Sequence, residues 1–122
     1  MPLVAVVDDD ISVRESLESL IKSVGLEVTV FASAEEFLSS CHPRDADCLI
    51  LDLRLPGMSG IELHRHLLAR GRHVPAAFIT AHDDRARSEA ASAWTIAYLT
   101  KPFSEDELLD AINAGLKWKP RA

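Results

Sequence analysis

The stretch Leu3-Val-Ala-Val-Val-Asp-Asp-Asp10 changes abruptly from apolar to acidic near the start of the chain. Its apolar part has the length of a β-strand, and an unbroken apolar run is typical of a strand buried on both faces of a parallel sheet. Four later runs of similar length predict four further strands. They are Val28–Phe31, Cys48–Leu51, Ala76–Ile79 and Ile96–Leu99.

Longer amphipathic segments separate these runs and predict helices. Strands that alternate with helices favour an α/β fold, with a doubly wound parallel sheet and helices on both faces. Apolar residues at helical spacing, capping pairs and terminal glycines mark four of the helices. These are Val13–Val24 before Gly25, the segment after Ser33 and Glu36, Ile61–Leu68 before Gly71, and the segment after Ser104 and Glu107.

Length and charge limit the classes of protein that the chain can represent. We expect one domain over residues 1–122, with a core at about 3–117 and a tail where a linker would begin, because 122 residues are too few for two domains. The net charge of −6 argues against direct nucleic-acid binding. No apolar run is long enough to span a membrane. Two cysteines, Cys41 and Cys48, cannot form a disulfide framework, so we expect a reduced, cytoplasmic setting.

Polar side chains follow four of the predicted strands. Asp8, Asp9 and Asp10 follow the first strand, Asp52 the third, Thr80 the fourth and Lys101-Pro102 the fifth. Open parallel sheets bind ligands at the carboxyl ends of their strands, so these groups are expected to converge. Clustered carboxylates repel one another unless a cation joins them, and an all-oxygen donor set favours Mg²⁺. An aspartate can also act as a nucleophile, and a lysine can neutralise a phosphoryl group.

These motifs together resemble the receiver domain of two-component response regulators. The resemblance extends over almost the whole chain, and it includes Val-Val-Asp8-Asp9-Asp10, Asp52-Leu-Arg-Leu-Pro-Gly-Met-Ser-Gly60, Ile79-Thr80 and Tyr98-Leu-Thr-Lys-Pro-Phe103. The stretch Phe31-Ala-Ser-Ala-Glu-Glu-Phe-Leu38 is similar to that of nitrogen-fixation and LuxR-type transcriptional regulators. The resemblance implies a flavodoxin-like strand order, 2-1-3-4-5.

The resemblance also implies a phosphoacceptor and a metal site. Asp52 would take a phosphoryl group from the phosphohistidine of a sensor histidine kinase. Asp9, Asp52 and the backbone carbonyl of Arg54 would bind Mg²⁺ directly, and Asp8 would bind it through water. Arg54 and His82 would flank the water that hydrolyses the phosphoryl group, or they would simply face solvent.

Further residues would sense the phosphoryl group. Lys101 would pair with its oxygens, Thr80 would move to hydrogen-bond it, and Tyr98 would follow by turning inward. Lys101-Pro102 would carry a cis peptide bond. We thus expect an Mg²⁺-dependent signalling switch that is not an enzyme. Its partners would be the kinase, a second copy of the chain on phosphorylation, and a DNA-binding output domain or protein.

Two other functions remain open. The chain could be a protein-interaction module with the same fold that is not phosphorylated. An aspartyl-nucleophile phosphatase would need a second acid two residues after Asp52, where Arg54 stands. A metal site at Cys41, His42 and Cys48 would have too few ligands, so buried thiols are the better interpretation.

The chain departs from the resemblance before the fifth strand. Trp94-Thr95 replaces a usual Gly-Ala pair, and the span from Thr80 to Lys101 is one residue short. The segment Arg85–Ala93 is also poor in large apolar residues, so we expect an atypical fourth helix. Trp94 would either be an exposed anchor for a partner or fill the space that a displaced helix leaves.

Overall fold

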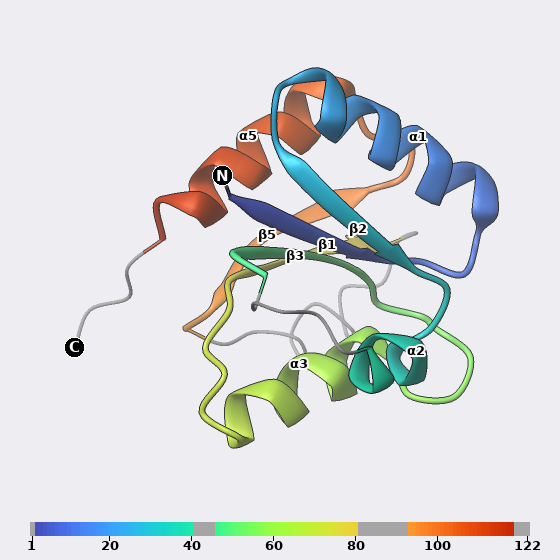
Figure 1. The fold of residues 1–122 in the computed structure, drawn as a ribbon, viewed down its shortest axis with the longest axis vertical. Helices are drawn as coiled ribbons and strands as arrows, with labels where there is room; N and C mark the ends of the chain where they lie inside the picture. Colours follow the sequence, from blue (N-terminus) through green and yellow to red (C-terminus); the bar gives the residue numbers. More distant parts are fainter. Residues whose placement is uncertain (1, 41–45, 81–92, 119–122) are drawn as a thin grey trace.

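Five parallel strands form one sheet in the order β2-β1-β3-β4-β5, which confirms the predicted fold class (Figure 1). The computed structural model describes residues 2–40, 46–80 and 93–118. The strands lie close to the predicted apolar runs, with small extensions at their ends. They are β1 (Leu3–Val7), β2 (Glu27–Phe31), β3 (Cys48–Asp52), β4 (Ala76–Thr80) and β5 (Thr95–Thr100).

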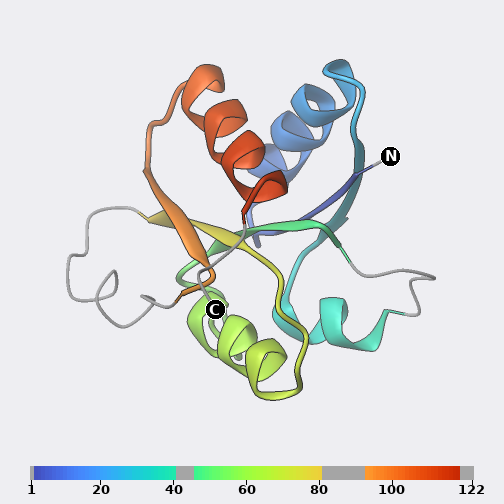
Figure 2. The same ribbon diagram turned by 90° about the vertical axis from the view of Figure 1, so that its left-hand side faces the viewer.

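Helices cover both faces of this sheet. Helices α1 (Ile11–Ser23) and α5 (Glu105–Leu116) lie on one face, and α2 (Ala34–Ser39) and α3 (Gly60–Ala69) lie on the other (Figure 2). Side chains alternate along each strand, so neighbouring residues enter different halves of the core. In β1, Val4 and Val6 pack on the side of α1 and α5, while Ala5 and Val7 pack on the side of α2 and α3.

The middle of the sheet explains why the apolar runs are unbroken. Strands β1 and β3 are neighbours, and every residue of β1 is buried because helices cover both of its faces. Their register pairs Val7 with Leu51. As a result, the residues that follow Val7 and Leu51 leave the sheet side by side at its carboxyl edge.

The two predicted capping boxes form only in part. Ser33 Oγ accepts the N–H of Glu36 (3.0 Å), and Ser104 Oγ accepts the N–H of Glu107 (3.1 Å). In a full capping box, the glutamate carboxylate also accepts the backbone N–H of the cap serine, and this second bond does not form at either helix. Glu36 accepts the N–H of Ala32 (3.2 Å), and the Glu107 carboxylate contacts the Ser104 hydroxyl instead (3.4 Å).

The predicted fourth helix, Arg85–Ala93, lies outside the described residues except for Ala93, and so does His82. Trp94 is half-buried, and its ring stacks on His73 with centroids 5.4 Å apart and planes 14° from parallel. This contact favours packing over full exposure for Trp94.

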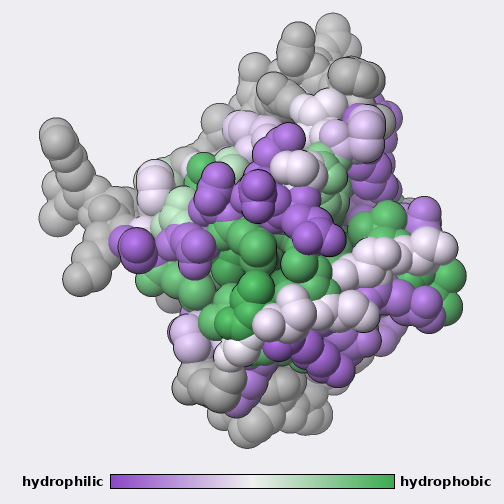
Figure 3. All heavy atoms as spheres, turned by 90° about the horizontal axis from the view of Figure 1, so that it is seen from above, coloured by the Kyte–Doolittle hydropathy of each residue, from purple (hydrophilic) through white to green (hydrophobic). Residues whose placement is uncertain are grey.

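The face that carries α1 and α5 shows hydrophobic side chains bordered by hydrophilic ones (Figure 3). A shallow pocket there is lined by residues of α1 and by Phe103, just before α5. Ile11, at the start of α1, is 60% exposed although it is large and apolar.

Among the described residues, no helix has the length and apolar character needed to cross a membrane.

Candidate metal centre

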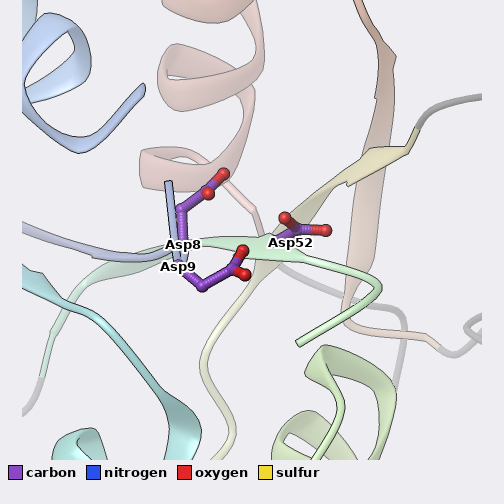
Figure 4. A group of neighbouring side chains, drawn as sticks. All are labelled: Asp8, Asp9 and Asp52. Carbon is purple, nitrogen blue, oxygen red and sulfur yellow. The ribbon is translucent and has the colours of Figure 1, made fainter. Parts of the chain in front are cut away.

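Three carboxylates from two neighbouring strand ends lie together. Asp8 and Asp9 follow β1, and Asp52 ends β3, so the β1–β3 register brings them to one point (Figure 4). One oxygen of each side chain lies within 4.8 Å of the others. The convergence that the sequence predicted for these three residues is therefore present.

Asp8 is the buried member of this cluster. Its side chain is fully inaccessible, and its Oδ1 accepts the N–H of Asp10 at 2.9 Å. Its Oδ2 is also buried and has no hydrogen-bond partner among the described residues. Lys101 Nζ lies 4.0 Å from this oxygen. A carboxylate that lies beside two other acids and keeps one oxygen without a hydrogen-bond partner is a group that a cation would satisfy.

The raised pKa values of Asp8 and Asp52 also favour a bound cation at this point. Burial is the main cause that raises the pKa of Asp8, while the Asp10 N–H and Lys101 act against it. Burial likewise raises the pKa of Asp52, followed by repulsion from Asp8 and Asp9. The fold thus disfavours two carboxylate charges that it nevertheless places together. Because all the donors are oxygens, the cluster fits Mg²⁺ better than zinc or copper.

Asp52 is held by the chain that follows it. Its Oδ1 accepts the N–H of Arg54 at 2.9 Å, while the Arg54 side chain is exposed. Gly60 opens α3 directly behind Asp52, and a Cβ at this position would overlap the Asp52 carbonyl oxygen. The role predicted for the Arg54 carbonyl stays a prediction.

Helix α3 begins with a complete capping box, which was not among the predicted ones. Ser59 Oγ accepts the Glu62 N–H at 3.1 Å, and the Glu62 carboxylate accepts the Ser59 N–H at 3.3 Å. The signal was present as a Ser-x-x-Glu spacing. This cap fixes the point at which the loop after Asp52 becomes helix.

Thr80 and Lys101 flank the cluster from β4 and β5. Thr80 is the last residue of β4 and is 4% exposed. Its carbonyl accepts the N–H of Lys101 at 3.0 Å, which ties the two strand ends together. The Lys101–Pro102 peptide bond is cis. Tyr98 is half-buried in β5, and its ring lies 6.2 Å from that of Phe78, close to parallel.

Cys48 is the one residue of the alternative cysteine and histidine site that the structure describes, and it lies at the opposite end of β3 from Asp52. Cys48 is a free, fully buried thiol, and burial raises its pKa to about 12. Cys41 and His42 lie outside the described residues. His64 is buried and its Nε2–H donates to the carbonyl of Val74 at 3.0 Å, whereas His66 is half-exposed. The two rings therefore lie in different surroundings, one inside the core and one at the surface.

Residues 4–113 match the response regulator receiver domain family, and the chain belongs to that family. Nodulation protein W of Bradyrhizobium diazoefficiens is 47% identical over 113 residues, which are 92% of this chain and 50% of that protein. The transcriptional regulatory protein FixJ of Azorhizobium caulinodans is 42% identical over 114 residues, 93% of this chain and 54% of that protein. These names agree with the predicted similarity to nitrogen-fixation regulators.

Solved structures give the same fold. The response regulator StyR superposes with a TM-score of 0.82 at 50% identity, over 95% of this chain and 59% of that one. The response regulator TrrA of Thermotoga maritima, solved in complex with Mg²⁺ and BeF, superposes with a TM-score of 0.80 at 29% identity, over 93% and 97% of the two chains. This chain spans about half the length of the curated relatives it matches.

Proposed function

We propose that this chain is a phospho-accepting switch in which Asp52 receives a phosphoryl group and Mg²⁺ binds beside it. The supporting observation is the orphaned, buried Oδ2 of Asp8 within a cluster of three carboxylates. Asp8, Asp9, Asp52 and the Arg54 carbonyl would hold the ion. When bound, the ion would offset the charge of the carboxylates and of the incoming phosphoryl group.

In this proposal Asp52 acts as the nucleophile. Its Oδ1 is engaged by the Arg54 N–H, which orients the carboxylate and leaves the other oxygen to attack phosphorus. A P–N bond of a phosphohistidine donor breaks as the O–P bond forms. Lys101 neutralises the phosphoryl oxygens, because its ammonium group lies at the cluster, 4.0 Å from Asp8.

The proposed switch works through a difference in binding between two conformations. A phosphoryl group offers strong acceptors to Thr80 and Lys101, and it shifts the equilibrium toward the conformation that satisfies them better. The bond from the Lys101 N–H to the Thr80 carbonyl couples β4 to β5 at this point. Tyr98 lies on the same strand, so a displacement of the strand end reaches its ring.

The partners follow from the site and from the relatives. A sensor histidine kinase supplies the phosphoryl group, and the exposed Ile11 offers it an apolar contact two residues after Asp9 of the acidic cluster. The proposed output is control of transcription through a DNA-binding domain or protein, as the name of the FixJ relative suggests. Pairing of two copies on phosphorylation is part of the same proposal. In this proposal the chain is a signalling module and not a metabolic enzyme, because Arg54 stands where a phosphatase needs an acid.

Incubation with acetyl phosphate and Mg²⁺ followed by intact-mass analysis tests the proposal. We expect the wild type to gain the mass of one phosphoryl group, and we expect EDTA to prevent the gain. Asp52→Asn should gain nothing, because it lacks the nucleophile. Asp106→Asn, which removes an exposed acid from the first turn of α5, is the control and should behave as the wild type does. A wild type that stays unmodified would favour the unphosphorylated interaction module instead.

A further inference from the structure

The loop from β3 to α3, residues 53–59, includes Arg54, whose backbone N–H donates to Asp52. Its first residue is anchored, since the Leu53 N–H donates to the Ile79 carbonyl at 3.0 Å and the side chain is 3% exposed. Its end is fixed by the cap at Ser59. Pro56 and Gly57, at the tip between these anchors, are exposed. The tip therefore needs a contact from elsewhere to be held.

Glu35, in the first turn of α2, makes that contact. Its Oε2 accepts the N–H of Met58 at 3.0 Å, across 23 residues of sequence. Gly57 packs against the same carboxylate, because a Cβ there would lie 2.5 Å from Oε2, and its φ of +74° also favours glycine. Figure 1 shows this loop running beside α2. Two neighbouring residues of the loop are thus fitted to one carboxylate.

The neighbouring acid in α2 has a different contact. Glu36 accepts the N–H of Ala32 and so stays within its own segment. The bond from the Met58 N–H is the main cause that lowers the pKa of Glu35, as expected for a carboxylate that accepts a backbone N–H. The two adjacent glutamates therefore provide a test residue and a matched control with the same charge.

We propose that Glu35 is a positioning residue, whose carboxylate holds the tip of the 53–59 loop and thereby the Arg54 main chain against Asp52. This inference rests on the proposed function, in which Arg54 and Asp52 belong to the Mg²⁺ site. Glu35 touches neither the ion nor the phosphoryl group. It acts through the loop, in the way that residues behind a metal ligand fix the orientation of that ligand.

Three variants test this role: Glu35→Ala, Glu35→Gln and the control Glu36→Ala. Mg²⁺ affinity is measured by calorimetry, and exchange of the Met58 amide hydrogen is followed by NMR. We expect Glu35→Ala to weaken Mg²⁺ binding by about tenfold, the lower end of the range for residues behind a metal ligand, and to speed exchange of the Met58 amide. Glu35→Gln should restore most of both, because its amide oxygen can still accept the bond. Glu36→Ala should change neither.

The outcomes separate this inference from the proposed function. If Glu35→Ala matches Glu36→Ala in Mg²⁺ affinity or in Met58 exchange while the wild type binds Mg²⁺, the positioning role is overturned and the proposed function stands. If Glu35→Gln is as impaired as Glu35→Ala, the hydrogen bond is not the cause and the role is also overturned. A wild type that binds no Mg²⁺ overturns the proposed function, and this role for Glu35 with it.

Discussion

Replacing Asp8 with asparagine should stabilise the metal-free protein. The carboxylate is fully buried, and one of its oxygens lies within 4.8 Å of oxygens of Asp9 and Asp52. At that separation, each pair of charges repels by about 1 kcal/mol in water and about 3.5 kcal/mol at an effective dielectric of about 20. Lys101 offsets part of this repulsion, but its side chain is 38% exposed, so solvent screens its charge.

The expected net gain for Asp8→Asn is about 1–2 kcal/mol in the free energy of unfolding, or about 3–8 °C in Tm. The sign of the pH dependence follows from the pKa of Asp8, which burial raises above its ordinary value of 3.8. A raised pKa means that this group favours folding at low pH, and that the contribution is lost as pH rises through the folded-state value. The gap between the variant and the wild type should therefore open above about pH 4.

Thermal and urea unfolding in EDTA and in Mg²⁺ measure this effect. Adding Mg²⁺ should stabilise the wild type by RT ln(1 + [Mg²⁺]/Kd), and it should stabilise Asp8→Asn far less. Asp10→Asn is the matched control: Asp10 is outside the cluster and caps α1, where asparagine caps equally well. If metal-free Asp8→Asn proves less stable than the wild type, the pair with Lys101 outweighs the repulsion, and the argument for a cation at this point fails.

Three further perturbations follow from the packing. Gly60→Ala should cost about 2–3 kcal/mol and weaken Mg²⁺ binding, because its Cβ would overlap the Asp52 carbonyl; urea unfolding and Mg²⁺ calorimetry check this. Burial lowers the pKa of His64, so it favours folding above the unfolded value of about 6.5 and this stability is lost as pH falls; urea unfolding of His64→Gln should show a flatter pH dependence below about 6.5. Trp118→Phe should cost about 1 kcal/mol in thermal unfolding, through loss of the 2.8 Å bond from its indole N–H to the Ala93 carbonyl.

Unbroken apolar runs were enough to predict the strands of the sheet, because helices cover both faces of its central strands. Each predicted strand appears, and the acids that follow β1 and β3 meet, since neighbouring parallel strands end at the same edge. Within the acidic triplet, however, the pattern could not distinguish Asp8 from Asp9. The first is fully buried and the second is exposed, and this difference depends on how the chain turns after Val7.

Contacts between distant segments could not be predicted from spacing. The bond from Met58 to Glu35 spans 23 residues and exists only because the fold places α2 beside the β3–α3 loop. The stacking of Trp94 on His73 likewise requires the β5 entrance to lie beside the chain that follows α3. Capping residues predicted the starts of helices more reliably. Glu36 is a partial exception, because its carboxylate accepts the N–H of Ala32 and not that of the cap residue Ser33.

A crystal structure of the protein with Mg²⁺ and beryllium fluoride would show whether the three carboxylates and Lys101 form one phosphoryl-binding site. We expect a cation coordinated by Asp9 and Asp52, with Asp8 at its side, and a beryllofluoride group on Asp52 that Lys101 contacts. A cation bound elsewhere would contradict it, and so would a Lys101 ammonium group that bonds Asp52 directly with no ion between the three carboxylates.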